Sequence, residues 1–205
     1  MTLLDKLKRQ AQQAVRSAVA EGANTLADAL QDTAEELAKK KYTVTFSALP
    51  TTLAELQQLP EAALSEPHHA AALAVAALCA YPQHREAAEE MLAYLQGPRG
   101  ITGYDKQFLA DRFRGKDYVP RSYFEGAAPQ NGYTPAQPYT VTFFENAHSR
   151  DSFDEGYITL WVQSGGADNP REVKLRHKPS AGKWYLWEQF LLADIRTPAE
   201  ADPWA

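Results

Sequence analysis

Two copies of the pentapeptide Tyr-Thr-Val-Thr-Phe, at Tyr42–Phe46 and Tyr139–Phe143, alternate large apolar residues with threonine. A period of two is the pattern of a β-strand with one buried face. Between the two copies the hydrophobic spacing is mostly helical, so we expect both copies to be strands of one sheet that flank a helical insert. Residues 42–205 would then form a single folded unit.

The insert covers residues 51–115, where apolar residues recur at spacings of three and four. Four helices are expected there, over about residues 51–59, 68–80, 83–96 and 104–114. The second of these is apolar on every side, so we expect it to lie in the centre of the core. Prolines and glycines end the individual helices.

The last third of the chain has the alternation of an antiparallel meander. After the strand at the second pentapeptide, further strands are expected over about residues 156–163, 171–178 and 183–188. Large apolar groups occur on both faces of the 156–163 strand, which predicts helices on one face and partial cover on the other. Residues 190–195 should form a short helix or turn over a sheet edge. The predicted fold class is α+β, with about five antiparallel strands, including 42–46, and the four-helix segment packed against them.

Residues 1–41 carry a long helical pattern without proline. The apolar stripe is narrow and mostly alanine, so this segment buries too little area to form a core by itself. We expect an N-terminal amphipathic helix that acts as an arm or tether and pairs with a protein partner or with a second copy of the chain. Its basic, amphipathic start also suits a membrane surface, but the few bulky apolar residues make that alternative less favoured.

Composition narrows the class of protein. With 205 residues, 44% of them hydrophobic, the chain can bury a sizeable core as one domain with an appendage. Its formal net charge of −5 argues against a nucleic-acid partner, because phosphate neutralisation needs a basic face. Cys79 is the single cysteine, so no intrachain disulfide is expected, and the N-terminus lacks a secretory signal. These features favour a cytoplasmic protein.

Motifs of catalysis, metal binding and nucleotide binding are missing from the sequence. His68 and His69 are adjacent, so on a helix their side chains point about 100° apart and do not grip one metal ion together. The acidic loop at residues 145–155 does not have the spacing of an EF-hand, and we expect it to be solvated. Apolar neighbours should raise the pKa of Cys79, the wrong direction for a nucleophile. We therefore expect no catalytic residue, no metal site and no cofactor.

Residues 115–138 have no periodicity and contain four prolines and four aromatic residues. Irregular segments of this length are usually functional loops. Arginine with tyrosine in a loop over a sheet is typical of a small-molecule or peptide site. The candidate binding residues are Arg121, Tyr123, Asp168 and Arg171. The competing interpretation, which is favoured, is that the arginines form structural ion pairs with acidic residues such as Glu172, Glu188 and Asp194.

Several unusual strings occur from residue 91 onward. They are MLAYLQGPRGITGYDKQFLADR, RSYFEGAAPQNGYTP, SGGADNPREVKLR and GKWYLWEQFLLADIRTPAEADPWA. In this order they resemble a bacterial family of unknown function, over about residues 42–205. The resemblance implies a bacterial, cytoplasmic α+β domain, and it transfers no activity and no site residue.

Three functional hypotheses follow. The favoured one is a non-enzymatic binding or interaction module. The first alternative is an enzyme with a pocket between sheet and helices, in which Asp168, His148 or Tyr123 supplies acid–base chemistry on a small anionic substrate. The second alternative is a peripheral membrane protein that is tethered through its N-terminal helix.

Overall fold

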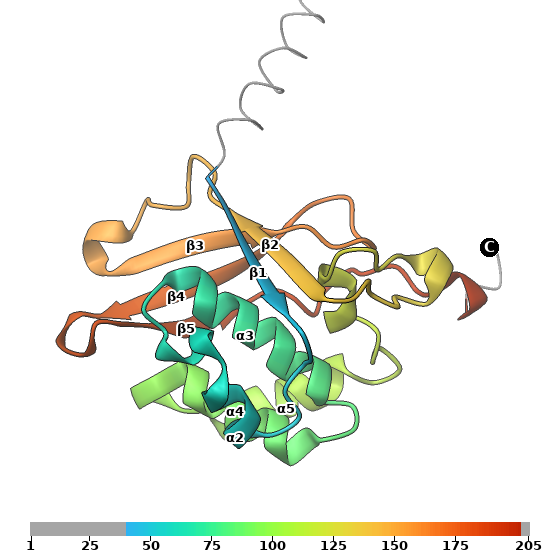
Figure 1. The fold of residues 1–205 in the computed structure, drawn as a ribbon, viewed down its shortest axis with the longest axis horizontal. Helices are drawn as coiled ribbons and strands as arrows, with labels where there is room; N and C mark the ends of the chain where they lie inside the picture. The colour runs from blue at the N-terminus through green and yellow to red at the C-terminus, as the bar shows by residue number, and fades with distance from the viewer. Residues whose placement is uncertain (1–39, 202–205) are drawn as a thin grey trace, which may run out of the picture. The chain divides into compact units, whose positions relative to one another are not determined.

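The structure is a computed structural model that describes residues 40–201 (Figure 1). Its five strands follow one another across a single antiparallel sheet, in the order in which they occur in the sequence. The strands are β1 (Lys41–Phe46), β2 (Tyr139–Phe144), β3 (Tyr157–Val162), β4 (Arg171–Lys178) and β5 (Lys183–Gln189). The α-helices in this part of the chain are α2 (Leu53–Gln58), α3 (Pro67–Ala80), α4 (Arg85–Gln96) and α5 (Gly103–Arg112). The predicted α+β fold, the meander and the four helices of the insert are confirmed.

The predicted N-terminal helix lies outside the described residues, apart from its last two positions. Lys40 precedes the sheet and Lys41 is the first residue of β1, so the helix predicted over residues 1–41 does not extend that far.

The two copies of Tyr-Thr-Val-Thr-Phe pair with each other. Val44 lies opposite Val141, and the flanking residues match in antiparallel register from Tyr42 with Phe143 to Phe46 with Tyr139. On the exposed face, the Oγ1 atoms of two cross-strand threonine pairs lie 3.0 and 3.1 Å apart. On the other face, Val44 and Phe46 are buried. The recurrence in the sequence therefore corresponds to one ladder of paired strands.

Helix α3 forms the centre of the core. It contacts β1, β3, β4 and β5, and α4 packs against it (Figure 1). Every residue from Ala70 to Ala77 is fully buried. Because most of these residues are alanine, strands and helices can approach the α3 backbone closely on all sides. This explains why the helix is apolar without a polar face.

The segment at residues 115–138 is an ordered strap with two short 3-10 helices, Pro120–Tyr123 and Pro129–Asn131. Its aromatic side chains point into the core, and Tyr118 stacks on Tyr133 with the ring centroids 5.2 Å apart. After β5, buried Leu191 and Leu192 lie in a turn, in agreement with the predicted short helix or turn.

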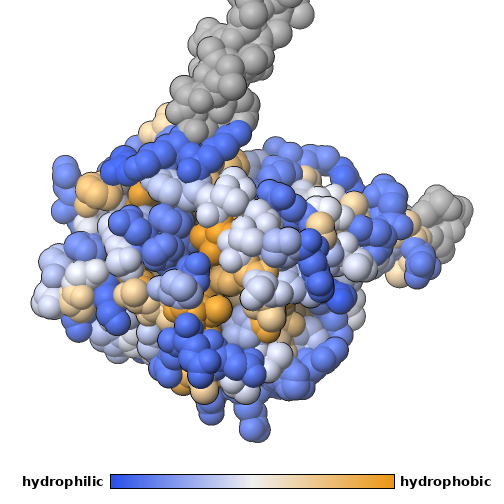
Figure 2. Space-filling view, in the orientation of Figure 1, coloured by the Kyte–Doolittle hydropathy of each residue, from blue (hydrophilic) through white to orange (hydrophobic). Residues whose placement is uncertain are grey.

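Side chains alternate along β3 as predicted. Ile158, Leu160 and Val162 are buried, whereas Tyr157 and Trp161 on the other face are half-buried. The view in Figure 2 shows a largely hydrophilic surface with hydrophobic residues visible near its centre. None of the helices within residues 40–201 has the length and hydropathy that crossing a bilayer requires.

Candidate functional site

Asp168 and Arg171, two of the predicted binding residues, line the same shallow pocket of about 310 Å³ after β3. The guanidinium of Arg171 donates to the carbonyl oxygens of Ala193 (3.0 Å), Asn169 (2.8 Å) and Asp194 (2.9 Å). Asp168 forms an ion pair with Arg196. The hydrogen-bonding groups of Arg171 therefore hold the segment after β5 against the β3–β4 connection.

Tyr123 is buried and donates its hydroxyl to the carbonyl oxygen of Leu191 at 2.6 Å. Burial raises its pKa strongly, and the positive charge of Arg171 opposes that rise only in part. Arg121 is exposed on the same 3-10 helix and does not line the pocket of Asp168 and Arg171. Both Tyr123 and Arg171 thus anchor the chain around residues 191–194, and their binding role stays a prediction.

Structural pairing of the arginines occurs, but with other partners than those expected from the sequence. Within residues 40–201, no ion pair joins Arg171 to Glu172, Glu188 or Asp194. Arg171 binds backbone carbonyls instead, because the turn after β5 brings two of them, and the β3–β4 connection a third, within reach of one guanidinium.

The other candidate groups for chemistry lie apart from one another. His148 is exposed, with its Nδ1 3.0 Å from a carboxylate oxygen of Asp151. Burial raises the pKa of the Cys79 thiol to about 12. In the described part of the chain, no group of three histidine, cysteine, aspartate or glutamate residues is placed to hold a metal ion.

A larger pocket, of about 510 Å³, lies at the outer strand β5. Its walls come from the end of α4, the following 3-10 turn Gly97–Arg99, and strands β4 and β5. We call it the arginine pocket and define it by Gln96, Arg99, Arg176, Lys178, Tyr185 and Trp187. Its lining contains no acidic residue. The pocket therefore concentrates positive charge next to aromatic rings on a protein whose net charge is negative.

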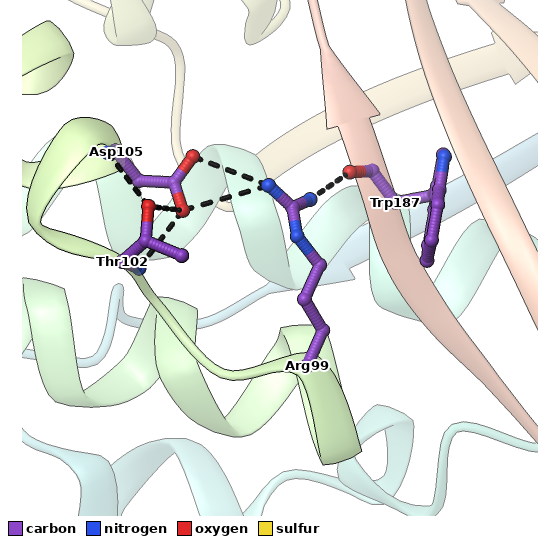
Figure 3. A network of polar contacts seen from close by, with 4 residues as sticks. All are labelled: Arg99, Thr102, Asp105 and Trp187. Carbon is purple, nitrogen blue, oxygen red and sulfur yellow. Dashed lines mark hydrogen bonds and ion pairs between the residues drawn. The ribbon is translucent and has the colours of Figure 1, made fainter.

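Arg99 is held in a fixed position at the edge of this pocket (Figure 3). Its Nη1 donates to the carbonyl oxygen of Trp187 at 2.6 Å, and its Nη2 lies 3.3 Å from Oδ1 of Asp105. Asp105 in turn accepts from the backbone N–H of Thr102 at 2.9 Å, as part of the capping box that begins α5. Capping of the helix and positioning of the arginine thus use the same carboxylate.

Arg176 projects from β4 on the same side as Tyr157 and Trp187. The central carbon of its guanidinium lies 4.8 Å from the ring centroid of Trp187 and 5.1 Å from that of Tyr157. Among the described residues, its side chain has no hydrogen-bond or ion-pair partner. Its donors are consequently available to an anion, while the rings restrain the side chain.

A β-bulge places Trp187 in the wall. Leu175 pairs with Leu186 and Lys174 with Glu188, so Trp187 is an extra residue on β5 without a partner on β4. Bulges re-aim side chains in this way and are common next to functional sites. The carbonyl oxygen of Trp187 is left free of the ladder and accepts from Arg99.

Gly97 allows the turn after α4 to approach β5. Its φ is +58°, and a Cβ atom there would lie 2.4 Å from the ring of Tyr185. Only glycine satisfies both conditions without strain. Beside it, the Oε1 atom of Gln96 is buried without a hydrogen-bond partner, so the wall holds an unused acceptor.

The sequence pattern identifies neither Arg99, Arg176 nor Trp187 as a site residue. The string Gly97-Pro98-Arg99-Gly100 has the pattern of a helix end, and the structure places it at the end of α4. In the sequence, Trp187 resembles a structural residue that covers the edge of the sheet. The one usable signal is the pair of closely spaced glycines around Arg99, both with φ near +60°. Such a pair indicates a turn that must pass close to another element.

The comparisons with known proteins give a family and no activity. A family model described as a domain of unknown function (DUF6935) matches residues 48–199. No curated protein and no solved structure matches the chain. The match covers α2 to α5 and β2 to β5, including all residues of the arginine pocket, and it agrees with the resemblance to a family of unknown function. The chain therefore belongs to the DUF6935 family.

Proposed function

We propose that the protein is a non-enzymatic binding module and that the arginine pocket binds an anionic group of its ligand. The observation that carries the proposal is Arg176, whose guanidinium contacts aromatic rings but has no hydrogen-bond or ion-pair partner among the described residues. It lines, together with Arg99, a pocket without acids. A planar guanidinium matches the geometry of a carboxylate or phosphate and binds it with two parallel hydrogen bonds.

The surroundings of the pocket strengthen the attraction of an anion. Arg99 and Arg176 both lie within 5.5 Å of the ring centroid of Trp187, so two guanidiniums share one aromatic wall. Rings of low polarity displace water from one side of the pocket, and charge interactions are stronger where less water screens them. The ring faces of Tyr185 and Trp187 also offer a contact to a flat or apolar part of the ligand.

The three acid–base groups expected from the sequence lie away from the arginine pocket, which favours binding over the enzyme expected from the sequence. Asp168, His148 and Tyr123 do not line the arginine pocket. Asp168 pairs with Arg196, His148 with Asp151, and the hydroxyl of Tyr123 donates to Leu191. The arginine pocket is lined by His177 and Tyr185 instead, so the enzyme expected from the sequence, with one of those three residues as its acid–base group, does not fit this pocket.

The cellular setting belongs to the same proposal. The single cysteine supports a cytoplasmic protein, and the unusual strings that the chain shares with a bacterial family support a bacterial one. The helical pattern of residues 1–41 supports a tether that pairs with a partner protein or a second copy. That segment lies outside the described residues, apart from Lys40 and Lys41.

The proposal is tested by calorimetric titration of the intact protein with citrate, inorganic phosphate and glucose 6-phosphate. At least one of these anions should bind, and Arg176→Ala should weaken that binding by at least about tenfold, which corresponds to the loss of about 1.4 kcal/mol of charged hydrogen bonding. Arg114→Ala is the matched control, because Arg114 is 79% exposed and does not line the pocket. Equal affinities of the two variants would contradict the proposal.

A further inference from the structure

An apolar groove lies next to the arginine pocket. It has a volume of about 440 Å³ and runs between α3, α4, α5 and β5. Its floor includes Leu78, Leu92 and Leu186, which are only 1 to 3% exposed, so the groove reaches the hydrophobic core. An ion pair between Lys106 and buried Glu89 joins α5 to α4, two of the helices that border the groove.

Two aromatic side chains stand at the mouth of this groove. Tyr104 is 79% and Phe190 53% exposed, and both line the groove. In the described part of the chain, Phe153 is the only other large hydrophobic residue with comparable exposure. Clustered exposed aromatic residues beside an apolar groove mark an interaction surface, and tyrosine and phenylalanine are enriched in protein–protein interfaces.

The groove and the arginine pocket share a wall that consists of Gln96, Arg99 and Trp187. The charged groups are distributed unequally over the two cavities. The arginine pocket contains no acid, and Arg176 in it has no hydrogen-bond or ion-pair partner among the described residues. The groove is lined by two acids, Glu188 and Asp105, and Asp105 is already engaged by Arg99 and Thr102 (Figure 3). A ligand that spans the shared wall therefore meets a cationic end and an apolar end.

We propose that the arginine pocket and the apolar groove together bind an acidic peptide segment of a partner protein. The carboxylate of an Asp or Glu side chain binds Arg176, and a large apolar side chain of the same segment enters the groove between Tyr104 and Phe190. The inference rests on the proposed function of the arginine pocket and names the partner of that same site.

A peptide presents the two required groups together. Along an extended peptide, side chains two residues apart point to the same side at a separation of about 6 to 7 Å, so one short segment offers an acidic group to the arginine pocket and an apolar group to the groove.

The test uses the intact protein and four pools of fluorescein-labelled octapeptides in an anisotropy titration. Each pool is random except at two positions that are two residues apart, which hold Glu and Phe, Gln and Phe, Glu and Ser, or Gln and Ser. The pool with Glu and Phe should bind at least about tenfold more tightly than each of the other three, because it alone fills both cavities.

Two variants assign the two preferences to the two cavities. Arg176→Ala should remove the preference for Glu over Gln and leave the preference for Phe over Ser. The double variant Tyr104→Ala and Phe190→Ala should remove the preference for Phe over Ser and leave the preference for Glu over Gln. Arg114→Ala and Phe153→Ala are matched controls at exposed positions that line neither cavity, and both should retain the wild-type pattern. All substituted side chains are exposed, and thermal unfolding of each variant checks that the fold is retained.

Three results would overturn the inference. If the four pools bind alike while citrate, phosphate or glucose 6-phosphate still binds through Arg176, the peptide partner is wrong and the proposed function stands. If no anion and no pool binds, both are wrong. If decanoate displaces the pool with Glu and Phe and requires the same side chains, the site takes an amphipathic acid rather than a peptide.

Discussion

Gly97 determines how closely the turn after α4 approaches β5, so a substitution there should be unusually costly. Gly97→Ala places a methyl group 2.4 Å from the ring of Tyr185 in a residue with φ of +58°. Gly100→Ala is the matched control, because Gly100 has φ of +62° and nothing within 4 Å of the added atom. The control should lower the free energy of unfolding by about 1 to 3 kcal/mol, the cost of the backbone conformation alone.

Gly97→Ala should lower the free energy of unfolding by at least about 1 kcal/mol more than Gly100→Ala does, because it adds a clash with the ring of Tyr185. Urea unfolding measures both variants. Equal losses would mean that Tyr185 moves aside freely and that the close approach does not define the pocket.

His68, in the first turn of α3, links the stability of the domain to pH. Its ring stacks on Tyr42 with the centroids 4.6 Å apart, and its Nδ1 atom is buried without a partner. Burial, and to a lesser extent the neighbouring His69, lower the pKa of His68 below its usual value of 6.5. The unfolded chain therefore binds a proton at a higher pH than the folded protein does, so this residue makes the fold less stable as the pH falls through 6.5.

His68→Phe keeps an aromatic ring against Tyr42 and removes the titration. Between about pH 7.5 and 5.5, the free energy of unfolding should fall less in this variant than in the wild type. Glu89 and Glu145 also have lowered pKa values, so the stability that they contribute is lost only around and below their usual 4.5, outside this window. Urea unfolding at several pH values measures this fall. If the free energy of unfolding changes with pH to the same extent in both proteins, His68 does not cause the loss of stability.

At the level of elements, the pairing of the two pentapeptides makes neighbouring positions in β1 unequal. The carbonyl oxygen of Lys40 accepts from the amide of Glu145, and hydrogen-bonded pairs alternate along an antiparallel ladder. The backbone groups of Val44 therefore point to β2, whereas those of Thr43 point to the outer edge of the sheet. A proline at each position removes a different N–H group.

Val44→Pro should lower the free energy of unfolding by about 2 kcal/mol or more, because it leaves a buried carbonyl without its donor. Thr43→Pro should cost about 1 kcal/mol, mainly through the lost contact with Thr142 at the exposed face. Thermal or urea unfolding of both variants measures the difference. A larger loss for Thr43→Pro would contradict the assigned register.

The sequence predicts elements well because each has its own hydrophobic period. Alternation identifies β1 and β3, and the apolar run of α3 identifies the core helix. The arginine pocket depends instead on cross-strand neighbours, such as Arg176 opposite Tyr185, and on the bulge that frees Trp187. Neither the register of β4 with β5 nor a bulge leaves a period in the sequence, so the pocket could not be predicted.

In the strap at residues 115–138, the sequence does not reveal which side chains are buried. Four prolines and no hydrophobic period predict a functional loop, yet Tyr118, Tyr123 and Tyr133 pack into the core. Isolated aromatic residues in an irregular segment give no sign of the direction in which they point. Tertiary contacts settle it here, because the hydroxyls of Tyr123 and Tyr133 reach backbone carbonyls after β5 at 2.6 and 2.7 Å.

On the scale of the whole molecule, a cationic pocket lies on a protein with a formal net charge of −5. The overall negative charge repels anions in general, so the attraction is confined to the neighbourhood of Arg99 and Arg176. The groove beside them, whose floor is formed by buried leucines, adds a second determinant that is apolar. The proposed binding module should therefore select ligands that combine a negative charge with an apolar group.

The most direct measurement is a nitrogen–proton NMR titration of the intact protein with citrate, phosphate or glucose 6-phosphate. The account predicts that chemical shifts change for the amides of Gly97, Arg99 and Arg176 and for the indole N–H of Trp187. Changes centred instead on Arg121, Asp168 and Arg171, or no changes at all, would contradict the assignment of anion binding to the arginine pocket.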